Sequence, residues 1–260
     1  MKRFFFVLTL LSLLATGCTS TTTTSKSDPD EERPQSPRDA AAYNTRLAVA
    51  YMRQGNLAAA QEKIDRALSQ DGQDATVRTT AGLIYERLGD NKKAEGYYSS
   101  AMRLKPDDPD VLNNYGVYLC RNGHPKEGGR LFVKAARNPL YRTPEVAYNN
   151  AGLCLKNAGL FDEAQVNFER ALALKPRFAD ALQQLADLNF EQGRVTEAQA
   201  LVQRYLGSLP ATPQILWLGV RVERALGNRP AADAYAKRLK TEYPKTEQTK
   251  ALLESERQSG

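Results

Sequence analysis

Histidine and cysteine are scarce in this sequence. Its 260 residues include one histidine and three cysteines, and no Cys-x-x-Cys pair occurs. His124 therefore has no second histidine with which to share a metal ion, and it lies in an Asn-Gly-His-Pro segment that predicts a turn. The GxSxG, P-loop and HExxH motifs are also absent. We therefore expect no enzyme, no metal or cofactor site and no small-molecule substrate.

Positive charge is in only mild excess. The formal net charge is +6, and it falls to +4 without Lys2 and Arg3, which belong to the N-terminal segment discussed next. A nucleic-acid-binding domain normally carries a stronger and more clustered positive charge. We therefore expect no nucleic-acid partner.

Long apolar runs are missing as well. The longest, Phe4–Leu14, has eleven residues and is broken only by Thr9 and Ser12, whereas a membrane-spanning helix needs about 20 apolar residues. It follows two basic residues and precedes Ala15-Thr16-Gly17-Cys18, so residues 1–17 are predicted to be a signal peptide. The ending resembles a bacterial lipobox, which would make Cys18 the lipidated first residue; the alternative is an ordinary signal with an incidental cysteine. No aspartate follows Cys18, so the expected location is the outer membrane, facing the periplasm.

Residues 18–40 are predicted to form a flexible tether behind the lipidated cysteine. Between Thr19 and Arg38 there is no aliphatic or aromatic residue, and there are three prolines. Such a segment cannot bury enough apolar surface to offset the entropy of its chain. The tether would let the folded part stand away from the membrane and reach a partner.

From residue 41 onward the sequence repeats itself. Glycines that could end a helix recur at intervals of 34, 34, 36, 34 and 34 residues, and small residues lie five places after each of them. A glycine in the left-handed conformation ends a helix, and small residues let two helices approach closely. The glycines are Gly55, Gly89, Gly123, Gly159, Gly193 and Gly227, and the small residues are Ala60, Ala94, Gly128, Ala164, Ala198 and Ala232.

This pattern resembles the tetratricopeptide repeat, a helix-turn-helix unit of 34 residues. The resemblance covers 41–246 and implies an all-α, right-handed solenoid of six units. The unit boundaries are 41–74, 75–108, 109–144, 145–178, 179–212 and 213–246.

Three departures from the repeat are informative. The third unit carries two extra residues, which we place in a loop at 137–143 because prolines bracket that stretch. The sixth unit is degenerate, with Val220 and Ala236 at consensus positions. Residues 247–260 are predicted to form a short capping helix, since terminal repeats need a polar outer face.

The resemblance also implies a peptide-binding groove lined by the first helix of each unit. Paired asparagines there offer donors and acceptors to a peptide backbone, and three cations would favour an acidic peptide or a C-terminal carboxylate. The alternative for the asparagines is that they cap or bridge neighbouring helices, and for the cations that they are simply solvated. The candidates are Arg87, Asn113, Asn114, Val117, Arg121, Asn149, Asn150, Leu153, Lys156 and Gln183, with Asp187 and Phe190 on the same side of unit five.

Cys120 and Cys154 lie in the first helices of adjacent units. First helices pack side by side and the expected compartment is oxidising, so we predict a disulfide between them. It would close a loop of about 34 residues and stabilise by roughly 3 kcal/mol. The alternative is a pair of buried free thiols, because the two positions differ by half a helical turn within their units.

The combination of lipobox, tether and repeats resembles the PilF/PilW lipoproteins of type IV pilus biogenesis. The resemblance spans the chain, and Asn113-Asn114-Tyr115-Gly116 and 148–154 (Tyr-Asn-Asn-Ala-Gly-Leu-Cys) are its most specific parts. It implies a pilotin that binds the secretin subunit and promotes its outer-membrane localisation and multimerisation. The alternative is a scaffold lipoprotein of the same build, serving outer-membrane protein assembly or a cell-wall hydrolase.

Overall fold

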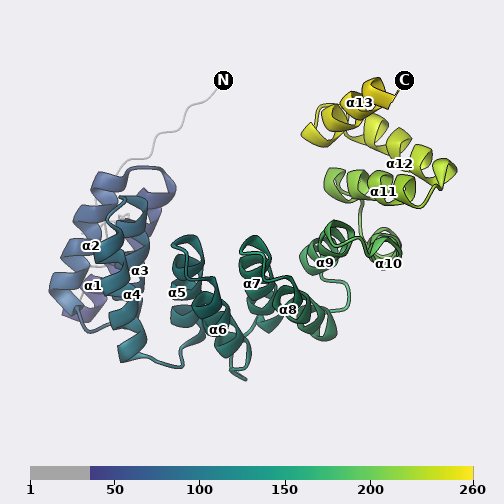
Figure 1. Ribbon diagram of the computed structural model, residues 1–260. Coiled ribbons are helices and arrows are strands. Elements are labelled where there is room, and N and C mark those ends of the chain that lie inside the picture. The colour runs from purple at the N-terminus through teal and green to yellow at the C-terminus, as the bar shows by residue number, and fades with distance from the viewer. Residues whose placement is uncertain (1–35, 260) are drawn as a thin grey trace, which may run out of the picture. The chain divides into compact units, whose positions relative to one another are not determined.

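The computed structural model describes residues 36–259, and within that range every regular element is an α-helix. The helices follow one another as antiparallel pairs joined by short turns (Figure 1). The predicted all-α fold is therefore confirmed. The helices are α1 (Pro37–Arg53), α2 (Leu57–Asp71), α3 (Ala75–Arg87), α4 (Asn91–Leu104), α5 (Pro109–Arg121), α6 (Pro125–Ala136), α7 (Pro144–Asn157), α8 (Phe161–Leu174), α9 (Ala179–Glu191), α10 (Val195–Leu206), α11 (Pro213–Ala225), α12 (Arg229–Glu242) and α13 (Glu247–Ser259).

Each pair packs onto the next in a regular way. We call the first helix of a pair the A helix (α1, α3, α5, α7, α9 and α11) and the second the B helix (α2, α4, α6, α8, α10 and α12). Every A helix contacts the A helix of the following unit, and every B helix contacts the next A helix. The stack ends on α13, which contacts both α11 and α12. This nearest-neighbour contact is how a repeat protein buries a continuous core.

The six repeated glycines end the A helices as the spacing predicts. All six adopt positive φ angles, between 73° and 84°. Residues other than glycine rarely adopt this backbone conformation without strain, which explains why glycine recurs at this place. At Gly123, for example, the chain turns and His124 donates its backbone N–H to the Leu119 carbonyl oxygen at 2.8 Å.

A second set of small residues allows the two helices of each unit to meet. A Cβ atom added to Gly152 of α7 would lie 2.6 Å from the Phe168 ring of α8, and one added to Gly116 would lie 3.1 Å from the Phe132 ring. Phe168 and Phe132 are almost fully buried. Each aromatic ring therefore occupies the space that a larger residue on the A helix would need.

The sixth unit departs from this arrangement by one residue. The sequence aligns Val220 with Ala236, but in the structure Gly219 of α11 lies against the ring of Tyr235 on α12. Both Val220 and Ala236 are buried in a separate cluster with Leu252 of the terminal helix. The shift lets the last pair receive α13 as its cap.

The helix bounds depart from the predicted unit boundaries at two places, since α7 begins at Pro144 rather than 145 and α1 begins before 41. The loop predicted at 137–143 joins α6 and α7, and the predicted capping helix is α13. Helix α1 begins at Pro37 rather than 41, because Ser36 caps it by accepting from the Asp39 backbone N–H and proline suits the first helical turn. The last residues of the predicted tether are therefore helical.

The signal peptide and Cys18 lie outside the described residues and stay predictions. Among the helices in the range 36–259, none combines the length and the apolar composition that a membrane crossing requires.

Candidate peptide-binding surface

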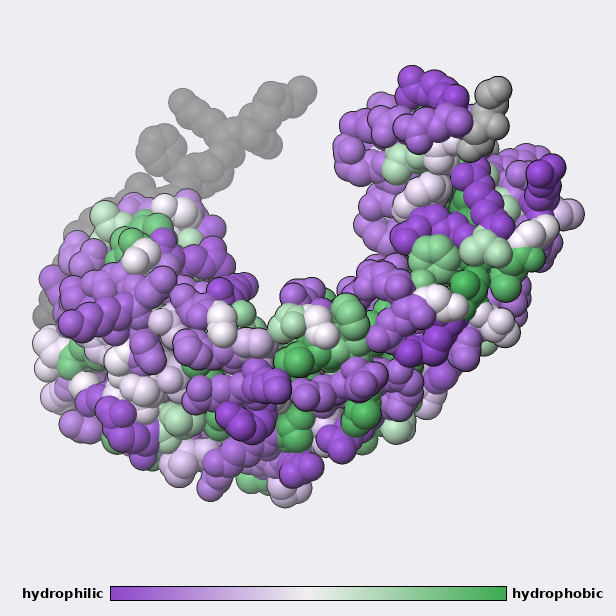
Figure 2. All heavy atoms as spheres, in the orientation of Figure 1, coloured by the Kyte–Doolittle hydropathy of each residue, from purple (hydrophilic) through white to green (hydrophobic). Residues whose placement is uncertain are grey.

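The predicted groove residues lie on the A helices, and most of them reach the surface. We call the exposed sides of α3, α5, α7 and α9 the A-face. The visible surface is mostly hydrophilic, with several patches of hydrophobic residues, one of them over α7 (Figure 2). Arg87 and Arg121 are exposed, Asn149 is buried, and the others are half-buried: Asn113, Asn114, Val117, Asn150, Leu153, Lys156 and Gln183.

The asparagines of adjacent A helices contact each other. Asn150 of α7 donates its side-chain amide to Asn113 Oδ1 of α5 at 3.3 Å. The bridging role considered for these residues is therefore present. It leaves the Asn113 amide group and Asn150 Oδ1 without partners among residues 36–259, so one donor and one acceptor remain for a ligand.

The other two asparagines differ in what they offer a ligand. Asn114 donates to the Asp110 carbonyl oxygen of its own helix at 2.7 Å, and its Oδ1 atom has no partner among residues 36–259. Asn149 is only 7% exposed, so its assignment to the groove is wrong. It precedes the buried Gly152 by three residues, and residues three apart share a helix face.

The cations of the A-face are largely neutralised by neighbouring repeats. Arg121 Nη1 lies 3.3 Å from Glu86 Oε1 of α3, and Lys156 Nζ lies 3.2 Å from Glu191 Oε1 of α9. Arg87 has no ion-pair partner among residues 36–259. The attraction for an acidic peptide that these three cations suggested is therefore reduced to one free charge.

The spacing of the charged residues in the sequence carries a signal for these two ion pairs. Glu86 precedes Arg121 by 35 residues, and Lys156 precedes Glu191 by the same spacing. Opposite charges one repeat plus one residue apart meet because adjacent A helices are offset. A search for that spacing would have found both pairs.

Glu86 is held in place from a second direction. The Tyr98 hydroxyl of α4 donates to Glu86 Oε2 at 3.2 Å. Burial and the neighbouring Glu86 carboxylate raise the pKa of Tyr98 well above its ordinary value, so this tyrosine stays a hydrogen-bond donor. The Tyr98 ring also packs against those of Tyr115 and Tyr118 on α5.

At the other end of the A-face, a partly buried carboxyl group, that of Asp187, interacts electrostatically with two cations. Burial raises the pKa of Asp187 from its ordinary value, while the charges of Lys156 and Arg221 act in the opposite direction. Arg221 of α11 lies over the Phe190 ring at 4.5 Å from its centre. This part of the surface is therefore arranged by contacts between repeats, like the part around Glu86.

The predicted disulfide between Cys120 and Cys154 is present. It joins α5 to α7 with a Cα–Cα distance of 5.7 Å. It therefore crosses the joint that contains the irregular loop at 137–143, and it links the same two helices as the Asn150–Asn113 hydrogen bond. A Cβ atom on Gly128 would lie 2.5 Å from Cys120 Sγ, so α6 can pass this bond only with glycine there.

The functional groups of the A-face are suited to binding another molecule. Within residues 36–259 there is no group of three or more His, Cys, Asp or Glu side chains that could hold a metal ion. Its free polar groups are carboxamides and one guanidinium, next to the apolar side chains of Val117 and Leu153. Carboxamides suit a peptide backbone, which also carries one donor and one acceptor per residue.

Comparison with known proteins agrees with the repeat architecture. Models of the tetratricopeptide repeat family match residues 45–109 and 157–218. Together with the stacked helix pairs and their turn glycines, these matches define a tetratricopeptide repeat protein.

Individual proteins narrow the assignment. The crystal structure of PilW, a widely conserved type IV pilus biogenesis factor, is 32% identical, with a TM-score of 0.69 over 82% of this chain and 98% of that chain. The type IV pilus assembly protein PilF of Pseudomonas aeruginosa is 25% identical over 90% of this chain and 93% of its own. A structure of Pseudomonas aeruginosa PilF has the same fold, with a TM-score of 0.67 and 22% identity over 84% of this chain and 99% of that chain. The chain belongs to the PilF/PilW family of tetratricopeptide repeat proteins.

Proposed function

We propose that this protein is a lipid-anchored pilotin of type IV pilus biogenesis, a binding protein rather than an enzyme. It binds the secretin subunit and promotes the subunit's localisation to the outer membrane and its multimerisation. The observation that carries the proposal is the junction of α5 and α7, where free carboxamide groups lie on two helices joined by a disulfide. Membership of the PilF/PilW family supports it.

The proposed mechanism begins with an extended secretin segment on the A-face. The Asn113 amide group donates to a backbone carbonyl of the segment, and Asn150 Oδ1 accepts from a backbone N–H. Val117 and Leu153 contact apolar side chains of the segment next to these bonds. Because the disulfide holds α5 and α7 in one arrangement, little conformational entropy is lost on binding.

The double substitution of Asn113 and Asn150 by alanine tests this surface. Each hydrogen bond contributes about 0.5–1.5 kcal/mol, so losing two is expected to raise the Kd for purified secretin roughly five- to 150-fold. The Kd is measured by titration of the soluble domain. The control is Gln203→Ala, which removes an exposed carboxamide from the B helix α10 and is expected to leave the Kd unchanged. A double variant that binds secretin as tightly as the unaltered protein would place the site elsewhere.

The anchor is tested by Cys18→Ser, which removes the proposed lipidation site. An acyl chain contributes about 0.8 kcal/mol per buried methylene group, so the variant is expected to leave the membrane fraction. Secretin multimers should then disappear from the outer membrane, as judged by fractionation and immunoblotting. Ser25→Ala, in the same segment, serves as the control and should behave like the unaltered protein. Multimers that still reach the outer membrane in the Cys18 variant would contradict delivery by the lipid anchor.

A further inference from the structure

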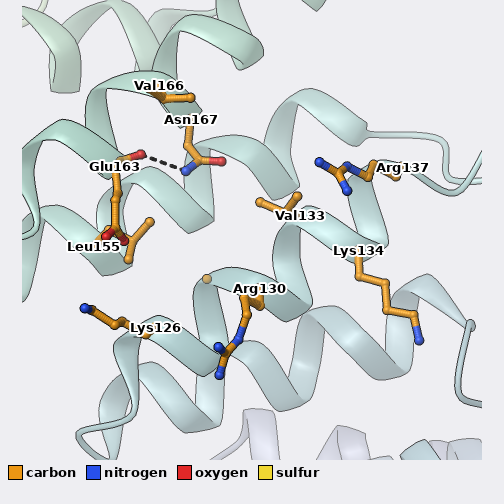
Figure 3. A pocket seen from close by; sticks show the side chains of 10 residues that line it. Lys126, Arg130, Val133, Lys134, Arg137, Leu155, Glu163, Val166 and Asn167 are labelled. Carbon is orange, nitrogen blue, oxygen red and sulfur yellow. Dashed lines mark hydrogen bonds between the residues drawn. The ribbon is translucent and has the colours of Figure 1, made fainter.

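A recess lies between two B helices, away from the asparagines of the A-face. It is formed by α6 and α8, with Leu155 of α7 beneath them, and has a volume of about 560 Å³. We call it the B-groove. Figure 3 shows Lys126 and Arg130 on α6 and Arg137 just after its last residue, across from Glu163, Val166 and Asn167 of α8.

The B-groove exists partly because a side chain is missing from it. Each B helix has one position that directly follows its small residue (Ala60 and the equivalents). In five units this position holds a glutamine or an acidic residue, whereas in the third unit it holds Gly129. Two of the equivalent residues bridge to the following unit: Gln165 accepts from Arg194 at 2.8 Å, and Gln199 donates to Glu223 at 3.0 Å. At Gly129 there is no such bridge, and the recess is open. The six equivalent residues are Gln61, Glu95, Gly129, Gln165, Gln199 and Asp233.

One polar group in the B-groove lacks a partner. Asn167 is 7% exposed, and its amide group donates to the Glu163 carbonyl oxygen at 2.8 Å. Its Oδ1 atom is buried and accepts no hydrogen bond from any residue in the range 36–259. A buried acceptor without a donor costs about 1–3 kcal/mol. A ligand N–H group that reached this atom by displacing the side chains over it would recover that cost.

The charge of the B-groove is positive. Lys126, Arg130 and Arg137 are exposed and form no ion pair with residues 36–259, whereas Lys134 is paired with Asp107 at 2.9 Å. Glu163 is the single carboxylate that lines the recess. Three free cations on one rim therefore face one acidic group on the other, and charge complementarity favours an acidic ligand.

The floor of the B-groove is apolar. Val133, Leu155 and Val166 line it, and Val166 is 44% exposed. A wholly polar acidic segment would leave this floor in contact with water. The protein's own segment 19–38 is of that kind, since it has no aliphatic or aromatic residue. The floor therefore favours a ligand from another molecule, one that carries apolar side chains as well as acidic ones.

We propose that the B-groove binds an extended segment of a partner protein in which acidic and apolar residues alternate. In an extended chain, successive side chains point to opposite sides. The apolar side chains contact Val133, Leu155 and Val166, the acidic ones face Lys126 and Arg130, and a backbone N–H donates to Asn167 Oδ1. This inference depends on the groove and not on the secretin proposal.

The test uses the substitution Gly129→Gln, which gives the third unit the residue found in three others. The new Cβ atom would lie 3.4 Å from the Leu155 side chain, which is an ordinary contact, and glutamine favours a helix more than glycine does. The variant should therefore fold and fill the B-groove without changing its charge. Gly96→Gln on α4 is the matched control, because a Cβ atom there meets nothing within 4 Å.

The probe is a labelled synthetic peptide of alternating glutamate and valine, compared with one of alternating lysine and valine, by fluorescence anisotropy. The protein and its Gly96 control are expected to bind the glutamate peptide at least tenfold more tightly than the lysine peptide, and less tightly as salt rises. Gly129→Gln should lose at least tenfold of that affinity. Equal binding of both peptides, or equal binding by the Gly129 variant and its control, would overturn the proposal. Binding to phosphatidylglycerol vesicles in place of the peptide would also overturn it, in favour of a lipid surface.

Discussion

Substituting alanine for Gly152 is expected to lower the free energy of unfolding by roughly 2–3 kcal/mol, the upper part of the range for overpacked cores. The added methyl group would lie 2.6 Å from one carbon of the Phe168 ring and 2.7 Å from a second. Phe168 is fully buried, so the ring cannot move into solvent. Helix α7 must therefore move away from α8, and contacts along the whole pair weaken. Urea denaturation followed by circular dichroism measures the loss.

The matched control is Gly96→Ala, which introduces the same methyl group on an exposed part of helix α4. Nothing lies within 4 Å of that position. Alanine favours a helix by about 1 kcal/mol over glycine, so this variant should gain a little stability. The contrast between the two variants separates packing from helix propensity. If Gly152→Ala were as stable as Gly96→Ala, the close approach of α7 and α8 would not be what requires glycine.

Removing the disulfide is expected to have an effect of similar size. The bond between Cys120 and Cys154 spans 34 residues, and closing such a loop stabilises by roughly 3–4 kcal/mol in the chain-entropy model. Replacing both cysteines by serine should lower the urea midpoint accordingly. The loss of stability arises mainly in the unfolded chain, which gains conformational entropy without the bond. The structure of the folded pairs α5–α6 and α7–α8 should change little.

Reduction of the unaltered protein supplies an independent measurement of the same quantity. Dithiothreitol should move the urea midpoint of the unaltered protein to that of the double serine variant, and it should leave the variant's own midpoint unchanged. A double variant as stable as the oxidised protein would contradict the stabilising role of the bond. The bond would then serve only to hold the joint at the loop 137–143.

Much of the architecture follows from the sequence because it depends on local backbone geometry. A glycine that must adopt a positive φ angle is recognisable wherever it recurs, and the spacing of Gly55, Gly89 and their equivalents locates every A-helix end. The change of spacing in the third unit places the loop between α6 and α7. Each of these features involves residues close together in the chain, so the pattern of one unit is enough to reveal it.

The binding surface follows from the sequence only in part. The sequence places Asn113, Asn114, Asn149 and Asn150 on one side of their helices, yet Asn149 is buried, whereas the other three keep free groups at the surface. Asn149 and Asn150 are adjacent in the chain, yet the first side chain is buried and the second is half-buried. Which of the two is buried depends on how far the neighbouring helix pair is rotated, and a single unit does not determine that rotation.

The sequence by itself determined the helix pairs, their turns and the close approach of A and B helices. Only the tertiary structure decided that Glu86 neutralises Arg121, that Asn149 is buried, that the sixth unit shifts by one residue, and that the absence of a side chain at Gly129 opens a groove between α6 and α8. The physical reason is the same in each case. Helix formation and turn geometry are set within a unit, whereas contacts between units depend on the offset and rotation of one helix pair against the next.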